Sequence, residues 1–129
     1  MNLIEHADGD ALDQAVAARL GEACEASIAA TGRARLALAG GSTPMPVYRE
    51  LARRSLDWPR VMLLPGDERW VAHDDPACNL TAIRQAFAPR PADFRALTPE
   101  QPGAVPSLSA ALRSWAALDQ RLDACLLGM

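Results

Sequence analysis

The sequence predicts an α/β fold in which helices cover both faces of a mainly parallel sheet. Short apolar runs alternate with segments of helical periodicity along the chain, and this order is typical of parallel strands joined by helical crossovers. The runs are apolar at nearly every position rather than alternating, as in strands that are buried on both faces. Together these observations indicate a three-layer α/β/α, Rossmann-like arrangement.

The composition indicates a single domain over residues 1–129. Half of the residues are hydrophobic and 22% are charged, as in globular proteins, and this length allows one core rather than two. The net charge is −3, and all 13 basic residues are arginines scattered along the chain. This pattern excludes a catalytic lysine and disfavours a nucleic-acid partner.

Membrane and metal sites are also disfavoured by the sequence. No apolar run approaches membrane-spanning length, and the first residues lack a signal-peptide pattern. Cys24, Cys78 and Cys125 are widely spaced and show no metal-site spacing. We therefore expect reduced thiols, a cytoplasmic protein and no metal site.

The N-terminal third predicts a helix followed by a strand. Apolar residues at four-residue spacing predict a helix over 10–31, with Asp10 as its N-cap and Gly32 as its end. The apolar run 34–39 predicts the first strand. The residues expected on the buried stripe of the helix are Leu12, Val16, Leu20, Cys24 and Ile28.

The remaining elements follow from the same patterns. We expect helices over 44–55, 80–87 and 107–121, and strands over 61–64, 93–97 and 123–127, the last of them buried. Thr43 is the expected cap of the first of these helices, with Pro44 at its first position, and Asn79 is the expected cap of the second. The inward stripe of the third helix is expected to include Leu108, Leu112, Trp115 and Leu122.

A glycine-rich turn follows the first strand. Gly40 and Gly41 allow a sharp turn and a close approach by a ligand, while Ser42 and Thr43 offer hydroxyl groups. A strand, glycines and a helix start can form an anion site, because free N–H groups and the positive end of the helix dipole converge there. The same glycines can also serve only to make the turn, and the spacing matches neither a P-loop nor a dinucleotide fingerprint.

A second polar loop, Asp67-Glu68-Arg69, follows the strand over 61–64. In extended chain, Asp67 and Arg69 point to one side and Glu68 to the other, so a carboxylate and a guanidinium face the ligand crevice, or form a plain surface ion pair. A helix N-terminus favours an anion by only about 0.3–2 kcal/mol. A phosphate site therefore needs a cation, and Arg69 is the best candidate.

The two loops together resemble the 6-phosphogluconolactonase family of the glucosamine-6-phosphate isomerase/6-phosphogluconolactonase superfamily. The resemblance covers residues 10–129 and is carried by the stretch 38–44, the Tyr48 helix, Asp57-Trp58, the stretch 66–71 and Asn79. The glycine stretch is shared with the glucosamine-6-phosphate deaminases. The Asp-Glu-Arg-Trp stretch is similar to the corresponding stretch of the lactonases.

The resemblance implies hydrolysis of 6-phospho-D-glucono-1,5-lactone to 6-phosphogluconate in the pentose phosphate pathway, without a metal or organic cofactor. It implies that Arg69 neutralises phosphate or oxyanion charge, that Asp67 lies beside the reacting lactone, and that Asn79 belongs to the binding site. The implied partner is the phosphorylated sugar lactone, and the oligomeric state, monomer or dimer, stays open. The residues implied to hold the phosphate are Gly40, Gly41, Ser42 and Thr43.

Two departures from the family pattern shape the expectation for this chain. Cys78 stands where the family usually has serine, and the chain resembles only the N-terminal part of the family. The family's next segment, Gly-x-Asp-Gly-His, is implied to hold the general base, and we expect His73 to be a solvated loop residue rather than its replacement. We therefore expect weak phosphate binding and little hydrolysis from residues 1–129. The alternatives are a glucosamine-6-phosphate deaminase or isomerase in which Asp67 moves the proton, and a non-catalytic sugar-phosphate-binding fragment.

Overall fold

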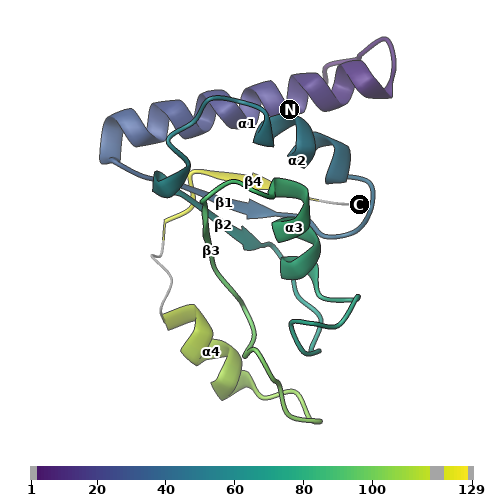
Figure 1. Cartoon of the computed structure of the whole chain (residues 1–129), viewed down its shortest axis with the longest axis vertical. Helices are drawn as coiled ribbons and strands as arrows, with labels where there is room; N and C mark the ends of the chain where they lie inside the picture. The colour runs from purple at the N-terminus through teal and green to yellow at the C-terminus, as the bar shows by residue number, and fades with distance from the viewer. Residues whose placement is uncertain (1–2, 117–120, 128–129) are drawn as a thin grey trace.

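The computed structural model describes residues 3–116 and 121–127 and contains alternating helices and strands (Figure 1). The long helix α1 leads into the first strand, and each later strand is preceded by a helix or a short helical turn. This order agrees with the predicted α/β fold. The elements are α1 (Gly9–Thr31), β1 (Ala34–Leu38), α2 (Met45–Ala52), the 3-10 turn η1 (Trp58–Arg60), β2 (Val61–Pro65), α3 (Asn79–Phe87), β3 (Asp93–Phe94), α4 (Leu108–Ala116) and β4 (Ala124–Leu126).

The described strands form one sheet in the order β3-β2-β1-β4, and all neighbouring pairs are parallel. β1 pairs with β2 over its full length, from Ala34 opposite Val61 to Leu38 opposite Pro65. β4 pairs with the second half of β1. The predicted parallel sheet is therefore confirmed.

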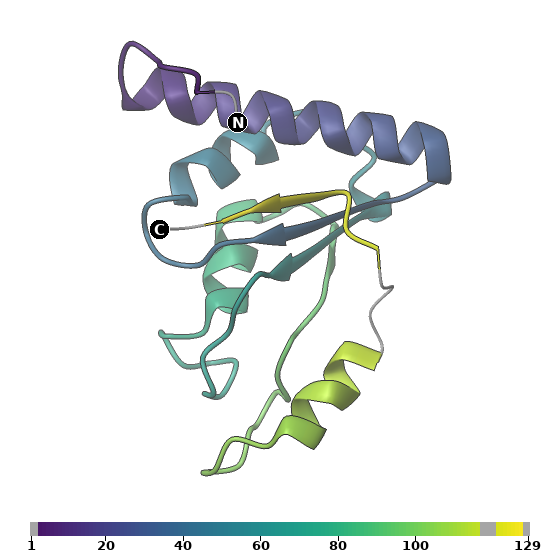
Figure 2. The same ribbon diagram turned by 180° about the vertical axis from the view of Figure 1, so that it is seen from behind.

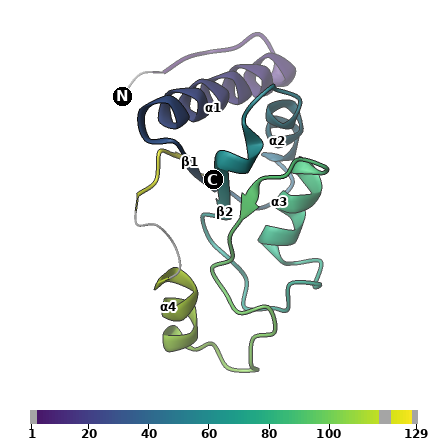
Figure 3. The same cartoon turned by 60° about the vertical axis from the view of Figure 1, so that its left-hand side comes forward.

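The strand order explains where the helices lie. The chain moves outward from β1 to β2 and β3, and then returns to the other side of β1 to form β4. Because parallel crossovers are right-handed, α2 and α3 lie on one face, where α2 packs between α1 and α3. The crossover that contains α4 passes on the opposite side, and α4 lies across the sheet from α1 in Figures 2 and 3.

The main core fills the space between the sheet and helices α1, α2 and α3. Alternate residues of β1 and β2 point into it, and Leu36, Leu38 and Leu63 are fully buried there. Phe87 and Tyr48 belong to this core, and their rings stack with 5.6 Å between the centroids. The opposite face of the sheet carries a smaller cluster of Ala37, Met62, Leu64 and Leu97.

Helix α1 agrees with the prediction except at its start and at one apolar position. Asp8, not Asp10, is the N-cap, because its carboxylate accepts the Ala11 N–H at 2.8 Å. Leu12 is exposed, because it lies near the helix end that extends past the core, whereas Leu20 and Cys24 are buried. Gly32 ends the helix in the left-handed conformation, as predicted.

The C-terminal elements differ more from the prediction. Leu108 and Leu112 of α4 are 76% and 53% exposed, so the predicted inward stripe is wrong there. Leu122 is also exposed and lies outside the helix, and the side chain of Trp115 lies outside the described residues. The sequence predicts a buried β4, but Cys125 is exposed, because β4 is an edge strand of the sheet that the described residues form. The third predicted strand is reduced to two residues in β3.

Candidate functional site

The two predicted loops begin side by side at the carboxyl ends of β1 and β2. Leu38 is opposite Pro65 in the register, and the Gly66 N–H donates to the Leu38 carbonyl at 2.8 Å. The chain after each strand therefore enters the same region of the molecule. This is the edge where parallel sheets bind ligands, next to the reversal of strand order between β1 and β4.

Gly40 is required by a neighbouring side chain. A Cβ atom at this position would overlap the carboxamide of Asn79. Asn79 is only 8% exposed, and its Nδ2 donates to the Asp67 carbonyl at 2.9 Å and lies 3.4 Å from Asp67 Oδ1. The bare backbone of the first loop thus makes room for the residue that connects α3 to the second loop.

Gly41 serves a different purpose, because its φ of 85° is in the left-handed region that favours glycine. A Cβ atom there would meet no other atom within 4 Å. Gly41 is exposed, as are Ser42 and Thr43 after it. Their surfaces are open to a ligand.

The start of α2 differs from the prediction. Pro44 is the N-cap and no side chain caps the helix, so the prediction for Thr43 is wrong. Pro44 and Pro46 have no N–H group, and the Met45 N–H donates to the Ser42 carbonyl at 3.3 Å. The first turn of α2 consequently offers few free donors, and an anion at this loop depends more on the loop itself and on a cation.

Asp67 and Arg69 point toward one another, as the alternation predicts. Arg69 Nη1 lies 3.2 Å from Asp67 Oδ2, and the two side chains are 61% and 65% exposed. An exposed ion pair of this kind stabilises a protein by about 0–1 kcal/mol. The guanidinium can therefore turn to a phosphate at small cost.

Glu68 points the other way and caps α3, a contact that the sequence analysis missed. Its Oε1 accepts the N–H of Asn79 at 2.7 Å and that of Arg69 at 2.8 Å, and its Oε2 accepts the N–H of Leu80 at 2.9 Å. The predicted cap, Asn79, is instead the first helical residue. Glu68 and Asn79 are eleven positions apart in the sequence, so no local capping pattern could reveal the contact.

A pocket of about 420 Å³ lies between the glycine loop, Arg69 and the start of α3. Four predicted site residues line it, namely Gly41, Ser42, Arg69 and Asn79, whereas Gly40, Thr43 and Asp67 lie beside it. Sequence reasoning did not place the other lining residues there. They are Met45, Pro76, Ala77, Cys78 and Ala82.

Nearby aromatic and histidine side chains are held by other contacts. Trp70 Nε1 donates to the Gly103 carbonyl at 2.7 Å, so its indole binds the loop before α4. His73 is half-buried rather than solvated as expected, because its Nε2 lies 3.1 Å from the Thr98 carbonyl oxygen. Within residues 3–116 and 121–127, no group of three or more histidine, cysteine or acidic side chains could hold a metal ion.

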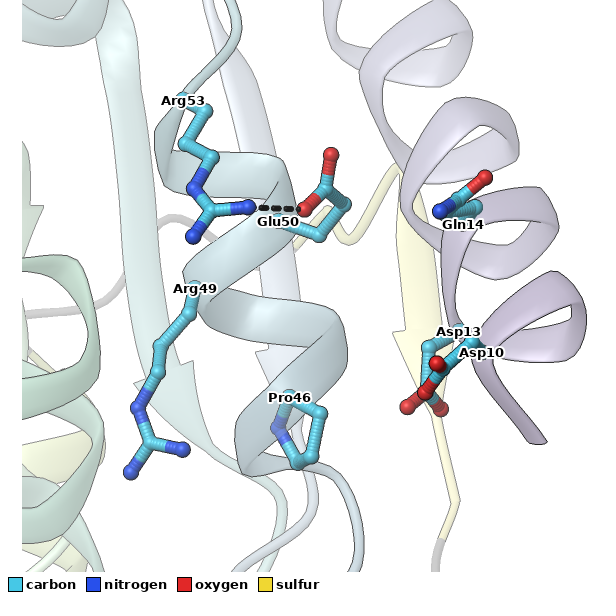
Figure 4. A pocket seen from close by; sticks show the side chains of 7 residues that line it. All are labelled: Asp10, Asp13, Gln14, Pro46, Arg49, Glu50 and Arg53. Carbon is cyan, nitrogen blue, oxygen red and sulfur yellow. Dashed lines mark hydrogen bonds and ion pairs between the residues drawn. The ribbon is translucent and has the colours of Figure 1, made fainter.

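A second pocket, of about 320 Å³, lies between the first half of α1 and α2 (Figure 4). Asp10 and Asp13 lie on one wall, and Arg49 lies on the other. Arg53 is paired with Glu50 at 2.7 Å in the same pocket. The lining contains both carboxylates and guanidiniums, so it lacks the single sign of charge that selects an ionic ligand.

Parallel strands, a glycine loop and a pocket that contains Arg69 at the carboxyl ends of β1 and β2 define a Rossmann-like α/β protein with a candidate anion site. In the part of the chain that the structure describes, no helix is both long and apolar enough to cross a membrane. The family model described as "Glucosamine-6-phosphate isomerases/6-phosphogluconolactonase" matches residues 7–129. The chain belongs to this family, and the resemblance of its two loops is confirmed.

Individual relatives agree with this assignment. The chain is 36% identical over 122 residues to a 6-phosphogluconolactonase of Rhizobium meliloti, covering 92% of this chain and 53% of the relative. The solved 6-phosphogluconolactonase of Shewanella baltica matches with a TM-score of 0.78 at 28% identity, over 88% of this chain and 48% of that one. The Thermotoga maritima 6-phosphogluconolactonase also gives 0.78, at 26% identity, over 99% and 58%. The chain thus spans about half the length of these relatives.

Proposed function

We propose that this chain binds 6-phospho-D-glucono-1,5-lactone and takes part in its hydrolysis to 6-phosphogluconate in the pentose phosphate pathway. The observation that carries the proposal is that the glycine loop, Arg69 and Asn79 line the same pocket. The names of the relatives supply the substrate. Residues 1–129 are then the N-terminal portion of a lactonase-like domain, and the protein is a cytoplasmic hydrolase that needs no cofactor.

The phosphate of the substrate is assigned to the loop 40–43 and Arg69. Micromolar affinity requires about 8 kcal/mol, and the short first turn of α2 offers at most about 2 kcal/mol of it. Charge-assisted hydrogen bonds contribute about 1.5–3 kcal/mol each. Arg69 and the exposed Ser42 and Thr43 hydroxyls are therefore the main phosphate contacts.

Hydrolysis requires a water molecule that attacks the lactone carbonyl and a donor that stabilises the oxyanion. In the alternative in which Arg69 faces the lactone instead of the phosphate, its guanidinium stabilises this charge, and a single such donor contributes about 2.7–4 kcal/mol. Asp67 lies beside the lactone in this arrangement. Among the described residues no histidine lines the pocket, so we expect residues 1–129 alone to bind the phosphorylated ligand weakly and to hydrolyse the lactone slowly.

The test is calorimetric titration of residues 1–129 with 6-phosphogluconate, together with an assay of its formation from the lactone. Arg69→Ala should weaken binding about 10- to 150-fold, because one charge-assisted contact is lost. Arg19→Ala is the matched control, since Arg19 is an exposed arginine of α1 that pairs with Glu22 on the surface and is not among the residues that line this pocket. Equal affinities of the two variants would contradict the phosphate site. Ammonia release from glucosamine 6-phosphate would favour a deaminase instead.

A further inference from the structure

The carboxylate of Glu68 lies at the centre of the contacts that join the second loop to α3. It accepts two N–H groups from the first turn of α3, from Asn79 and Leu80, and the N–H of Arg69. The Cys78 thiol lies 3.6 Å from Oε2 as a fourth donor. A carboxylate has about four acceptor positions, so Glu68 is fully occupied by these donors.

These hydrogen bonds hold the backbones of two residues that line the pocket, Arg69 and Asn79. The Glu68 bond to the Arg69 N–H sets the backbone from which the guanidinium extends into the pocket. The bond to the Asn79 N–H holds the start of α3, and the Asn79 carboxamide then binds the Asp67 carbonyl. Glu68 therefore links the backbones of Arg69 and Asn79, although it is absent from the residues that line the pocket.

Glu68 also determines which anion site stays open. A helix N-terminus attracts anions, but the one in α3 already holds the Glu68 carboxylate. A phosphate placed there would meet a like charge at short distance. No carboxylate is among the described residues that line the pocket beside the glycine loop, and the Asp67 carboxylate next to it is paired with Arg69.

We infer that Glu68 is a positioning residue: its carboxylate fills the N-terminus of α3, holds Arg69 and Asn79 at the pocket and leaves the loop 40–43 as the place for the substrate's phosphate. The identity of that ligand rests on the proposed function. The positioning itself rests on the hydrogen bonds of Glu68.

The experiment compares Glu68→Gln and Glu68→Ala with Asp8→Ala. Asp8 caps α1 through one bond to the Ala11 N–H and is absent from the residues that line the pocket, so its variant loses a helix cap without touching the site. The probes are titration with 6-phosphogluconate and hydrogen exchange of the Asn79 side-chain amide by NMR. Both Glu68 variants should lower the affinity at least tenfold and abolish the slow exchange of this amide, whereas Asp8→Ala should keep the affinity within twofold.

Two outcomes would overturn the inference: a Glu68→Gln affinity within twofold of Asp8→Ala, or an Asn79 amide that stays protected in the Glu68 variants. If the unmodified chain binds no 6-phosphogluconate, the proposed function fails. The Asn79 exchange then decides the positioning role by itself. Glu68→Gln keeps the side-chain size and one acceptor, so it provides the measurement even if Glu68→Ala does not fold.

Discussion

Replacement of Gly40 by alanine should destabilise the protein through one identified contact. The new Cβ would occupy the position of the Asn79 carboxamide, which must then move away from the Asp67 carbonyl. The lost hydrogen bond costs about 0.5–1.5 kcal/mol, and leaving the nearly buried amide unpaired costs about 1–3 kcal/mol more. Alanine also lowers the conformational entropy of the unfolded chain, which offsets about 0.4–1 kcal/mol of this loss. We expect a net loss of about 0.5–4 kcal/mol in the free energy of unfolding.

Urea unfolding of a double-mutant cycle tests this mechanism. Asn79→Ala removes the side chain that the new Cβ would meet, so Gly40→Ala in that background should cost at least about 1 kcal/mol less than in the unmodified chain. Gly41→Ala is the control, because it also places alanine in this loop and costs about 1–2 kcal/mol through its left-handed φ. The control should show no coupling to Asn79→Ala. Additive losses for Gly40→Ala and Asn79→Ala would refute the explanation.

Three further results are expected. Tyr48→Phe should lower the free energy of unfolding by about 1–3 kcal/mol in urea, because its hydroxyl donates to the buried Ala39 carbonyl at 2.7 Å; an unchanged midpoint would argue against that bond. A thiol reagent at pH 8 should label the exposed Cys125 well before Cys24, whose burial raises its thiol pKa to about 11, and equal rates would contradict the packing around α1. Because the Cys24 pKa is raised from 9.0 in the folded state, its contribution to stability should be complete below pH 9 and decline as the pH rises toward 11, and Cys24→Ala should flatten that decline in thermal melts.

The fold could be predicted largely because its signals are local. The run 34–38 is apolar at all but one position and forms β1, and Gly32 ends α1 because its conformation there suits glycine. The prediction of a buried stripe on α4 was wrong, because a helical period shows which residues share a face but does not show whether another element covers that face. Leu108 and Leu112 share a face of α4, as the period predicts, but both are exposed.

The site could be predicted only in part, because several of its contacts join distant segments. The glycine loop and Arg69 were identified from their places after two strands, and they line one pocket. The role of Gly40 depends on Asn79, and the cap of α3 depends on Glu68, both across long stretches of chain. Capping rules consider only neighbouring residues, so they assigned the cap to Asn79.

β1 is an interior strand of the described sheet, so we expect it to unfold later than the strands at the edges. β1 has hydrogen-bonded neighbours on both sides, β2 and β4, and the glycine loop follows it directly. Amide groups of such a strand exchange with solvent only through the larger openings of a protein. In native-state hydrogen exchange, Ala37 and Leu38 should therefore be among the slowest amides to exchange. By this prediction the glycine loop directly follows the part of the molecule that unfolds last.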